Sequence, residues 1–155
     1  MEFPTAAPPT LLGVTSYLLS LNGKAARERV TTRLAGRGLR LWHMAVLAAL
    51  VDFGPHAQRD LSVRLSVDPS DMAKVIDQLT TAGHVARARD GADRRRVLVT
   101  VTGSGRDLLA RLVDEATAVD EIVLADLTAA ERGQLHALLL RVFTAARAPG
   151  VASRS

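Results

Sequence analysis

The sequence predicts a mainly α-helical protein that carries one small β-hairpin. Most of the chain repeats its apolar residues at helical spacing, whereas residues 85–101 alternate apolar and polar side chains around a polar turn. At 155 residues with 48% apolar content, the chain is long enough for one domain with a helical extension. The sequence contains no cysteine, which excludes disulfides, thiolate metal sites and cysteine nucleophiles.

The first two helices are predicted by apolar periodicity. Apolar residues recur at helical spacing from Leu11 until two closely spaced glycines, which predicts one long first helix. Residues 41–51 are apolar on most faces and are followed by a Gly-Pro pair, so they should form a buried second helix. Neither run is a membrane span of about 18 apolar residues, and no basic segment precedes the first run as in a secretory signal. We therefore expect a cytoplasmic protein without a membrane partner.

A helix-turn-helix pattern follows. A short third helix over residues 56–65 and a tight turn precede a fourth helix from about Pro69 to Ala82. Asp68 can cap the fourth helix, proline suits its first position, and Gly83 supplies a left-handed C-cap. The inner face of this helix should hold four apolar residues, Met72, Val75, Ile76 and Leu79.

A β-hairpin with a strongly basic tip should come next. Two alternating segments, VARAR and RVLVTV, flank a polar DGAD turn near Gly91. Between His84 and Arg106 the chain carries six arginines and two aspartates, an excess of +4 that equals the net charge of the whole chain. Such a local positive charge favours a polyanionic partner that is touched at one place. Taken alone, however, a charged loop is most often a solvated surface.

Two further helices should complete the fold. Residues 104–124 return to helical spacing, and the capping box Thr128–Glu131 starts a last helix that runs to about Ala146. We expect residues 147–155 to be a disordered tail. Apolar residues of the two helices have the spacing of a core shared by two chains, namely Leu108, Leu109, Leu112, Val113, Val119, Leu135, Leu138, Leu139 and Val142.

The fourth helix and the hairpin tip together predict a DNA-binding surface. An α-helix about 10–12 Å across fits the major groove of B-DNA, and an arginine on a narrow hairpin can enter the minor groove, where negative potential is focused. Asp93, two residues before Arg95, would lie on the same side of an extended strand and hold the arginine guanidinium in place. The candidate DNA contacts are Arg64, Ser70, Asp71, Lys74, Gln78, Arg94, Arg95 and Arg96.

Three of these contacts have an alternative interpretation. The carboxylate of Asp71 repels phosphate, so Asp71 either accepts a hydrogen bond from a cytosine amino group or completes the cap of the fourth helix. Arg64 and Lys74 could equally be surface residues that favour solubility.

The order of the elements resembles the multiple antibiotic resistance regulator (MarR) family of winged-helix transcription factors. The resemblance covers residues 11–146 and is carried by the run LSVRLSVDPSDMAKVIDQLTTAGHVARARDGADRRRVLVTVTGSG. Its landmarks are the Leu-x-x-x-Gly end of the recognition helix, the D-x-R pair of the wing and the Thr-x-x-Gly that follows, formed here by Leu79, Gly83, Asp93, Arg95, Thr102 and Gly105.

The resemblance implies an architecture and a function. Residues 39–103 would form a winged helix-turn-helix DNA-binding domain, and residues 11–36 with 104–146 a helical region through which two copies pair. Such a homodimer would bind a pseudo-palindromic double-stranded DNA operator as a repressor. The sequence also has no nucleotide-binding loop, metal-spaced histidine pair or nucleophile motif, so we expect no enzymatic activity, cofactor or metal. The alternative is a winged-helix dimer that binds proteins and no operator. Thiol-oxidising members carry a reactive cysteine near the first helix, so peroxide sensing of that kind is excluded.

Family members also bind small aromatic effectors between the dimer helices and the DNA-binding lobe. By this likeness Tyr17, Trp42 and His43 would line an effector pocket. The alternative is that Trp42 and His43 are core residues of a buried helix.

Overall fold

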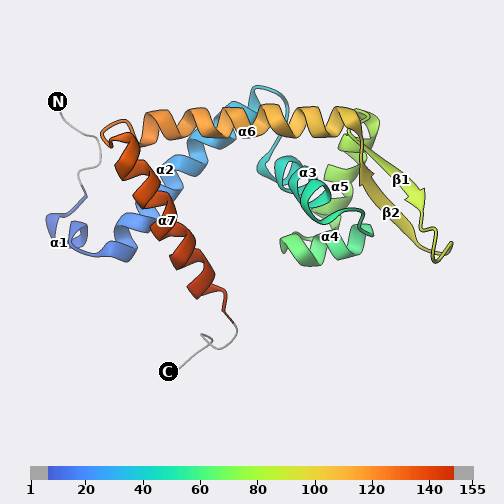
Figure 1. The fold of residues 1–155 in the computed structure, drawn as a ribbon, viewed down its shortest axis with the longest axis horizontal. Coiled ribbons are helices and arrows are strands. Elements are labelled where there is room, and N and C mark those ends of the chain that lie inside the picture. The colour runs from blue at the N-terminus through green and yellow to red at the C-terminus, as the bar shows by residue number, and fades with distance from the viewer. Residues whose placement is uncertain (1–6, 149–155) are drawn as a thin grey trace. The chain divides into compact units, whose positions relative to one another are not determined.

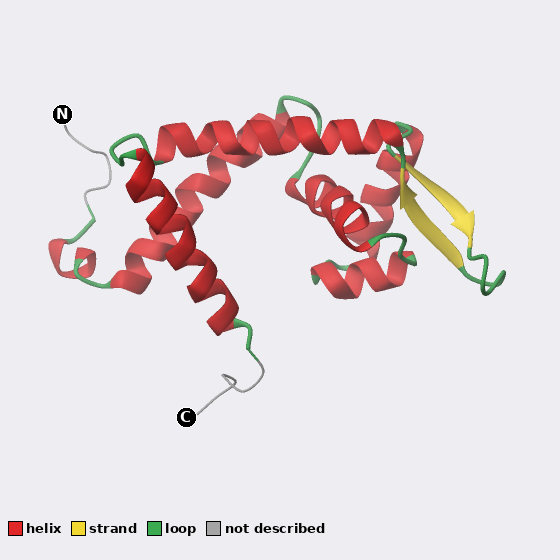
Figure 2. Cartoon of the chain, in the orientation of Figure 1, coloured by secondary structure: helices red, strands yellow, loops and turns green. Residues whose placement is uncertain are grey.

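A computed structural model of the chain describes residues 7–148 and confirms a mainly α fold with one β-hairpin (Figures 1 and 2). Within these residues no helix has the length and hydropathy needed to cross a bilayer. The described chain divides into two compact units, one that ends at Val119 and one that begins at Asp120. The elements are α1 (Pro9–Leu12), α2 (Thr15–Ala35), α3 (Leu41–Phe53), α4 (Gln58–Leu65), α5 (Pro69–Thr81), β1 (Val85–Arg89), β2 (Val97–Val101), α6 (Gly103–Val123) and α7 (Ala129–Ala146).

The N-terminal segment differs from the single long helix that its periodicity predicts. α1 ends after one turn at Gly13, and α2 begins after Val14, whose backbone is extended. The glycine lacks a side chain that would favour continued helix, so the interruption falls where helix propensity is lowest. The end of α2 is as expected, since Gly36 follows Ala35 and Gly38 adopts a left-handed φ of 69°.

The core of the first unit is built around α3, α4, α5 and the hairpin. Each of these elements contributes fully buried side chains, among them Leu47, Leu61, Ile76 and Val99. Leu34 from the end of α2 is also buried in this cluster. Burying a large aliphatic side chain contributes about 1.5–3 kcal/mol, so this shared cluster holds the helix-turn-helix and the hairpin together.

α6 is part of the same core, which corrects one expectation. Leu108, Leu112 and Val119 are buried within a single chain, and the first two belong to the central cluster. They are therefore not reserved for a core shared by two chains, as their spacing had indicated. Periodicity identifies a buried face but not which surface covers it. An ion pair between Arg37, just after α2, and Glu115 of α6 also joins these elements.

In the second unit, the start of α7 is fixed as its sequence predicts. The side chain of Thr128 accepts the backbone N–H of Glu131 at 3.2 Å, and the carboxylate of Glu131 accepts the N–H of Thr128 at 2.8 Å. The Nε of Arg132 donates to the carbonyls of Leu124 and Leu127, which gives these two acceptors of the turn before the helix a hydrogen-bond partner. Of the predicted tail, residues 149–155 lie outside the described part of the chain.

Candidate nucleic-acid interface

The fourth predicted helix is α5, and its two faces divide as expected. Met72, Val75, Ile76 and Leu79 are all buried. Ser70, Lys74 and Gln78 are exposed and Asp71 is half-buried, so the candidate contacts on this helix lie outside the core. α5 thus presents a polar face while its apolar face anchors it.

Asp68 sets the N-terminus of α5. One carboxylate oxygen accepts the backbone N–H of Ser70 at 2.8 Å and its hydroxyl at 2.5 Å. The hydroxyl and backbone bonds from Ser70 favour the charged form and lower the pKa of Asp68 below its ordinary value. The cap interpretation of Asp71 is not supported, because among the described residues no bond returns from its carboxylate to the N–H of Asp68. Aspartate is one methylene shorter than the glutamate that makes this bond in α7.

The C-terminus of α5 is closed by Gly83 and joined to α6. Gly83 has a φ of 79°. Its N–H donates to the carbonyl of Thr80, and the N–H of His84 donates to the carbonyl of Leu79. The hydroxyl of Thr102 donates to the carbonyl of Gly83 at 2.7 Å and accepts the N–H of Gly105 at 3.1 Å. Four landmarks of the sequence resemblance, Leu79, Gly83, Thr102 and Gly105, therefore meet at one joint between the recognition helix and α6.

The hairpin is anchored to the helix-turn-helix by a third backbone segment. β1 and β2 pair antiparallel from Val85↔Val101 to Arg89↔Val97. His56, in the loop before α4, exchanges both backbone hydrogen bonds with Val99, at 3.2 and 2.7 Å. The hairpin is thus a fixed extension of the domain and forms the wing, with its tip at residues 90–96.

The D-x-R pair lies in the turn of the wing and not on an extended strand, because β2 begins only at Val97. The carboxylate of Asp93 accepts the backbone N–H of Arg95 at 3.1 Å, whereas its distance to the guanidinium Nε is 3.8 Å. The main effect of Asp93 is therefore to shape the turn. The side chain of Arg95 is 97% exposed and points its charge into solvent at the wing tip.

The three consecutive arginines of the wing are not equivalent. Arg96 forms an ion pair with Asp60 of α4, and both side chains are about half exposed. Arg94 is exposed, and its carbonyl accepts a hydrogen bond from the guanidinium of Arg89 at 2.7 Å. Of the three predicted contacts, Arg96 is thus engaged by the protein itself, and its partner Asp60 was not predicted from the sequence.

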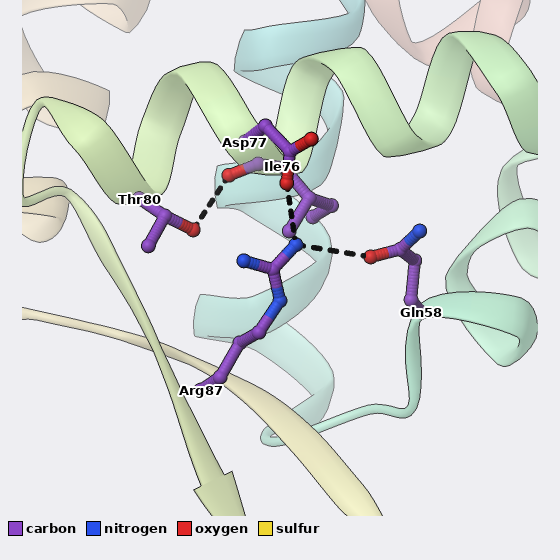
Figure 3. A network of polar contacts seen from close by, with 5 residues as sticks. All are labelled: Gln58, Ile76, Asp77, Thr80 and Arg87. Atoms are coloured by element: carbon purple, nitrogen blue, oxygen red, sulfur yellow. Dashed lines mark hydrogen bonds and ion pairs between the residues drawn. The ribbon is translucent and has the colours of Figure 1, made fainter.

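A second polar network joins the base of the wing to α5 and α4 (Figure 3). One nitrogen of the Arg87 guanidinium donates to Asp77 of α5 at 2.7 Å and to the side chain of Gln58 of α4 at 3.3 Å. Beside it, the hydroxyl of Thr80 bonds the carbonyl of Ile76 at 2.6 Å. The contacts of Arg87 with Asp77 and Gln58 were not predicted from the sequence.

Arg64 has a defined orientation on α4. Its Nε donates to Nε2 of His56 at 3.0 Å, and its guanidinium carbon lies 4.2 Å from the ring centre of Phe53. An open surface recess of about 530 Å³ is lined by His56, Asp60, Val63 and Arg64. Arg64 remains exposed, so it stays available to a phosphate while its stem is held.

The three residues predicted for an effector pocket do not meet within one chain. Trp42 is half-buried against the core, and His43 is buried with both ring nitrogens engaged. Tyr17 lies near the start of α2, about 25 Å along the helix axis from Leu34, the residue that enters the core. Residues 7–148 also contain no group of three or more potential metal ligands.

Comparisons with known proteins agree with this architecture. A family model described as MarR family matches residues 37–96. The HTH-type transcriptional repressor Mb2911 of Mycobacterium bovis is 32% identical over 123 residues, which cover 79% of this chain and 88% of the relative. The HTH-type transcriptional repressor NicR of Pseudomonas putida is 32% identical over 96 residues, covering 62% of this chain and 61% of its own length. The match to NicR therefore spans less than two thirds of that protein.

A solved structure gives the same result over most of the fold. The MarR family protein Rv2887 of Mycobacterium tuberculosis, in complex with salicylic acid, is 30% identical with a TM-score of 0.68. The alignment covers 90% of this chain and 99% of that one. Sequence and fold agree over nearly the whole length of both chains. This chain therefore belongs to the MarR family of winged-helix transcriptional regulators.

Proposed function

We propose that this protein is a homodimeric repressor that binds a pseudo-palindromic operator through α5 and the wing. The observation that carries the proposal is the arrangement of exposed cations around an exposed recognition helix. Lys74 projects from the polar face of α5, Arg64 from α4, and Arg95 from the wing tip, and all three are exposed. Helix and wing belong to one packed domain, so they can enter adjacent grooves as a unit.

The charge and hydrogen-bonding groups of each side chain indicate which part of the DNA it would contact. Lys74, Arg64 and Arg94 suit phosphate contacts, which fix the register of the domain on the duplex. Ser70 and Gln78 suit base edges or phosphates, and Asp71 suits a cytosine amino group. Arg95 suits the minor groove, because its side chain is 97% exposed and lies at the tip of the wing.

Dimerisation is supported by apolar side chains that one chain leaves uncovered. Within the described residues, large hydrophobic side chains of α2, of α6 and of α7 are exposed. A soluble monomer seldom exposes so many large apolar groups, and a two-fold interface would bury them. Those on α6 and α7 are Val113, Ile122, Leu138, Leu139, Leu140, Val142 and Phe143.

Regulation by a small aromatic acid is the second part of the proposal. The relative Rv2887 was solved in complex with salicylic acid. In this chain Trp42 would report on such a ligand, and Tyr17 would reach the pocket only from the second copy.

Titration with aromatic carboxylates, followed by Trp42 fluorescence and by release of DNA, should show both changes at the same ligand concentration. A DNA complex unaffected by a broad panel of such acids would reject this part.

The test of the proposed function is a gel-shift experiment with fragmented genomic DNA, with and without nonspecific competitor. A repressor of this kind should retain a small set of fragments in the presence of competitor, and the retained fragments should share a two-fold symmetric sequence. A dimer that retains no fragment at low salt would favour the alternative, a winged-helix module that binds other proteins.

A further inference from the structure

A buried histidine is hydrogen bonded to an exposed residue of the recognition helix. His43 occupies the third position of α3 and is 1% exposed. Its Nδ1 accepts the backbone N–H of Arg40 at 2.9 Å, and its Nε2 lies 2.7 Å from the side-chain oxygen of Gln78. Gln78 is exposed on α5. A core residue, His43, is therefore bonded directly to Gln78, one of the candidate DNA-contacting residues.

The geometry fixes where the histidine proton lies. A backbone N–H can only donate, so Nδ1 of His43 must be an acceptor. An imidazolium has no acceptor nitrogen, and the ring is therefore neutral with its proton on Nε2. Nε2 donates, and it must meet an acceptor, which the Oε1 atom of Gln78 provides.

The same chain of bonds fixes the amide of Gln78. The oxygen and nitrogen of a glutamine side chain are nearly equal in shape, and only the hydrogen-bond partners decide which is which. Here the oxygen is held by His43, and the amide nitrogen with its two N–H groups points away from that bond. Gln78 thus presents donors at the exposed surface of α5.

We infer that His43 is a positioning residue that makes Gln78 a hydrogen-bond donor toward the DNA. The complementary group is an acceptor, either a phosphate oxygen or the N7 and O6 edge of guanine. The common glutamine contact to adenine is disfavoured, because it needs the amide oxygen as well as the nitrogen. This inference rests on the proposed function, because it specifies that Gln78, a proposed DNA contact, acts as a hydrogen-bond donor.

Gln78→Glu tests the polarity without breaking the histidine bond. A carboxylate at position 78 still accepts from Nε2 of His43, so the variant should melt at or above the temperature of the wild type. It has no donor, however, and it faces acceptors with a negative charge. We expect its affinity to fall at least about tenfold. Gln134→Glu, an exposed position on α7, adds the same charge and serves as the matched control.

His43→Asn tests whether the histidine acts through Gln78. Asparagine can still accept the N–H of Arg40, but it is too short to reach Gln78 and leaves that amide free to rotate. We expect this substitution to weaken DNA binding in the wild-type background and to have no effect on binding in a Gln78→Ala background. A loss of binding that persists in the double variant would mean that His43 is only structural, and would overturn its positioning role.

The binding assays use full-length protein, a duplex selected from a random pool by the wild type, and an unselected duplex. An equal loss for Gln78→Glu on both duplexes identifies a phosphate acceptor, and a larger loss on the selected duplex identifies a base. Nitrogen NMR of the free protein should show His43 with a protonated Nε2 and a bare Nδ1.

Three further results would count against the inference. Gln78→Glu that binds both duplexes as tightly as wild type, or a His43 ring protonated at Nδ1, would overturn the inference and leave the proposed function standing. Wild-type protein that selects no duplex would overturn the proposed function, and the inference with it.

Discussion

The Arg96 guanidinium at the end of the wing turn forms an ion pair with the Asp60 carboxylate on α4. Together with the bonds from Arg87 to Asp77 and Gln58, it ties the wing to both helices of the helix-turn-helix. The wing and α5 are therefore held in one relative position before any DNA is bound. Such preorganisation lowers the ordering entropy that binding would otherwise require.

This relationship predicts that Asp60→Ala weakens DNA binding although it removes a negative charge. The released wing must be ordered again on the duplex, and exposed ion pairs of this kind are worth about 0.2–1 kcal/mol, which is up to about fivefold in affinity. Arg96→Ala should weaken binding at least as much. Asp52→Ala, which removes an exposed acid from α3, is the control and should bind slightly more tightly. Fluorescence anisotropy measures all three. Tighter binding by Asp60→Ala would indicate that Arg96 contacts phosphate itself.

Gly105→Ala should destabilise the domain. A Cβ atom at position 105 would lie 2.0 Å from the carbonyl oxygen of His84, so the joint between α5 and α6 must shift. We expect a loss of about 1–3 kcal/mol in unfolding free energy, measured by urea denaturation. Gly133→Ala on α7 meets open space and is the control, expected to gain up to about 1 kcal/mol. Equal stability of the two variants would show that the close approach at Gly105 carries no constraint.

The cap of α5 predicts a specific pH dependence. The pKa of Asp68 is lowered in the folded protein by its bonds from Ser70, so its contribution to stability is complete above the ordinary value of 3.8. That contribution is lost as the pH falls from there through the lowered pKa. Asp68→Asn keeps an acceptor for the cap but cannot titrate. The difference in unfolding free energy between wild type and this variant should therefore shrink on acidification from pH 6 to pH 3. A difference that is constant over this range would contradict the assignment.

Leu138→Asp on α7 should disrupt the dimer without unfolding the first unit. Leu138 is 54% exposed, so the substitution leaves the central core intact. We expect sedimentation equilibrium to show monomers for the variant and dimers for the wild type, with similar helical content by circular dichroism. Truncation before α6 is a poorer test, because it would remove Leu108 and Leu112 from the core. A variant that remains fully dimeric would place the interface elsewhere.

Local signals in the sequence predicted most of the fold, because caps and periodicity are encoded over a few residues. Asp68, Gly83 and the Thr128–Glu131 box each mark a helix end that the structure confirms. The buried face of α5 was predicted residue by residue for the same reason. The break in the first helix at Gly13 was missed, since the apolar spacing continues across it.

The long-range polar contacts of the candidate site could not be predicted. Asp60 is 36 residues from Arg96, and His43 is 35 residues from Gln78. Nothing local distinguishes these side chains from solvated ones, because their pairing depends on how α3, α4, α5 and the hairpin pack. One signal was available, since His43 stands three residues after Arg40 at the start of a helix, where a side-chain acceptor can cap the backbone.

The central claim is that the wing arginine enters the minor groove while the other cations contact phosphate. It is tested most directly by measuring the affinity of Arg95→Ala and Lys74→Ala for a selected and an unselected duplex over a range of salt concentrations. Lys74→Ala should weaken binding to both duplexes equally and reduce the salt slope of binding by about two for the dimer. Arg95→Ala should weaken binding to the selected duplex more than binding to the unselected one, because the negative potential of a narrow minor groove attracts an inserted arginine. Wild-type affinity and wild-type salt dependence for Arg95→Ala on the selected duplex would contradict the claim, because the wing would then be a solvated loop.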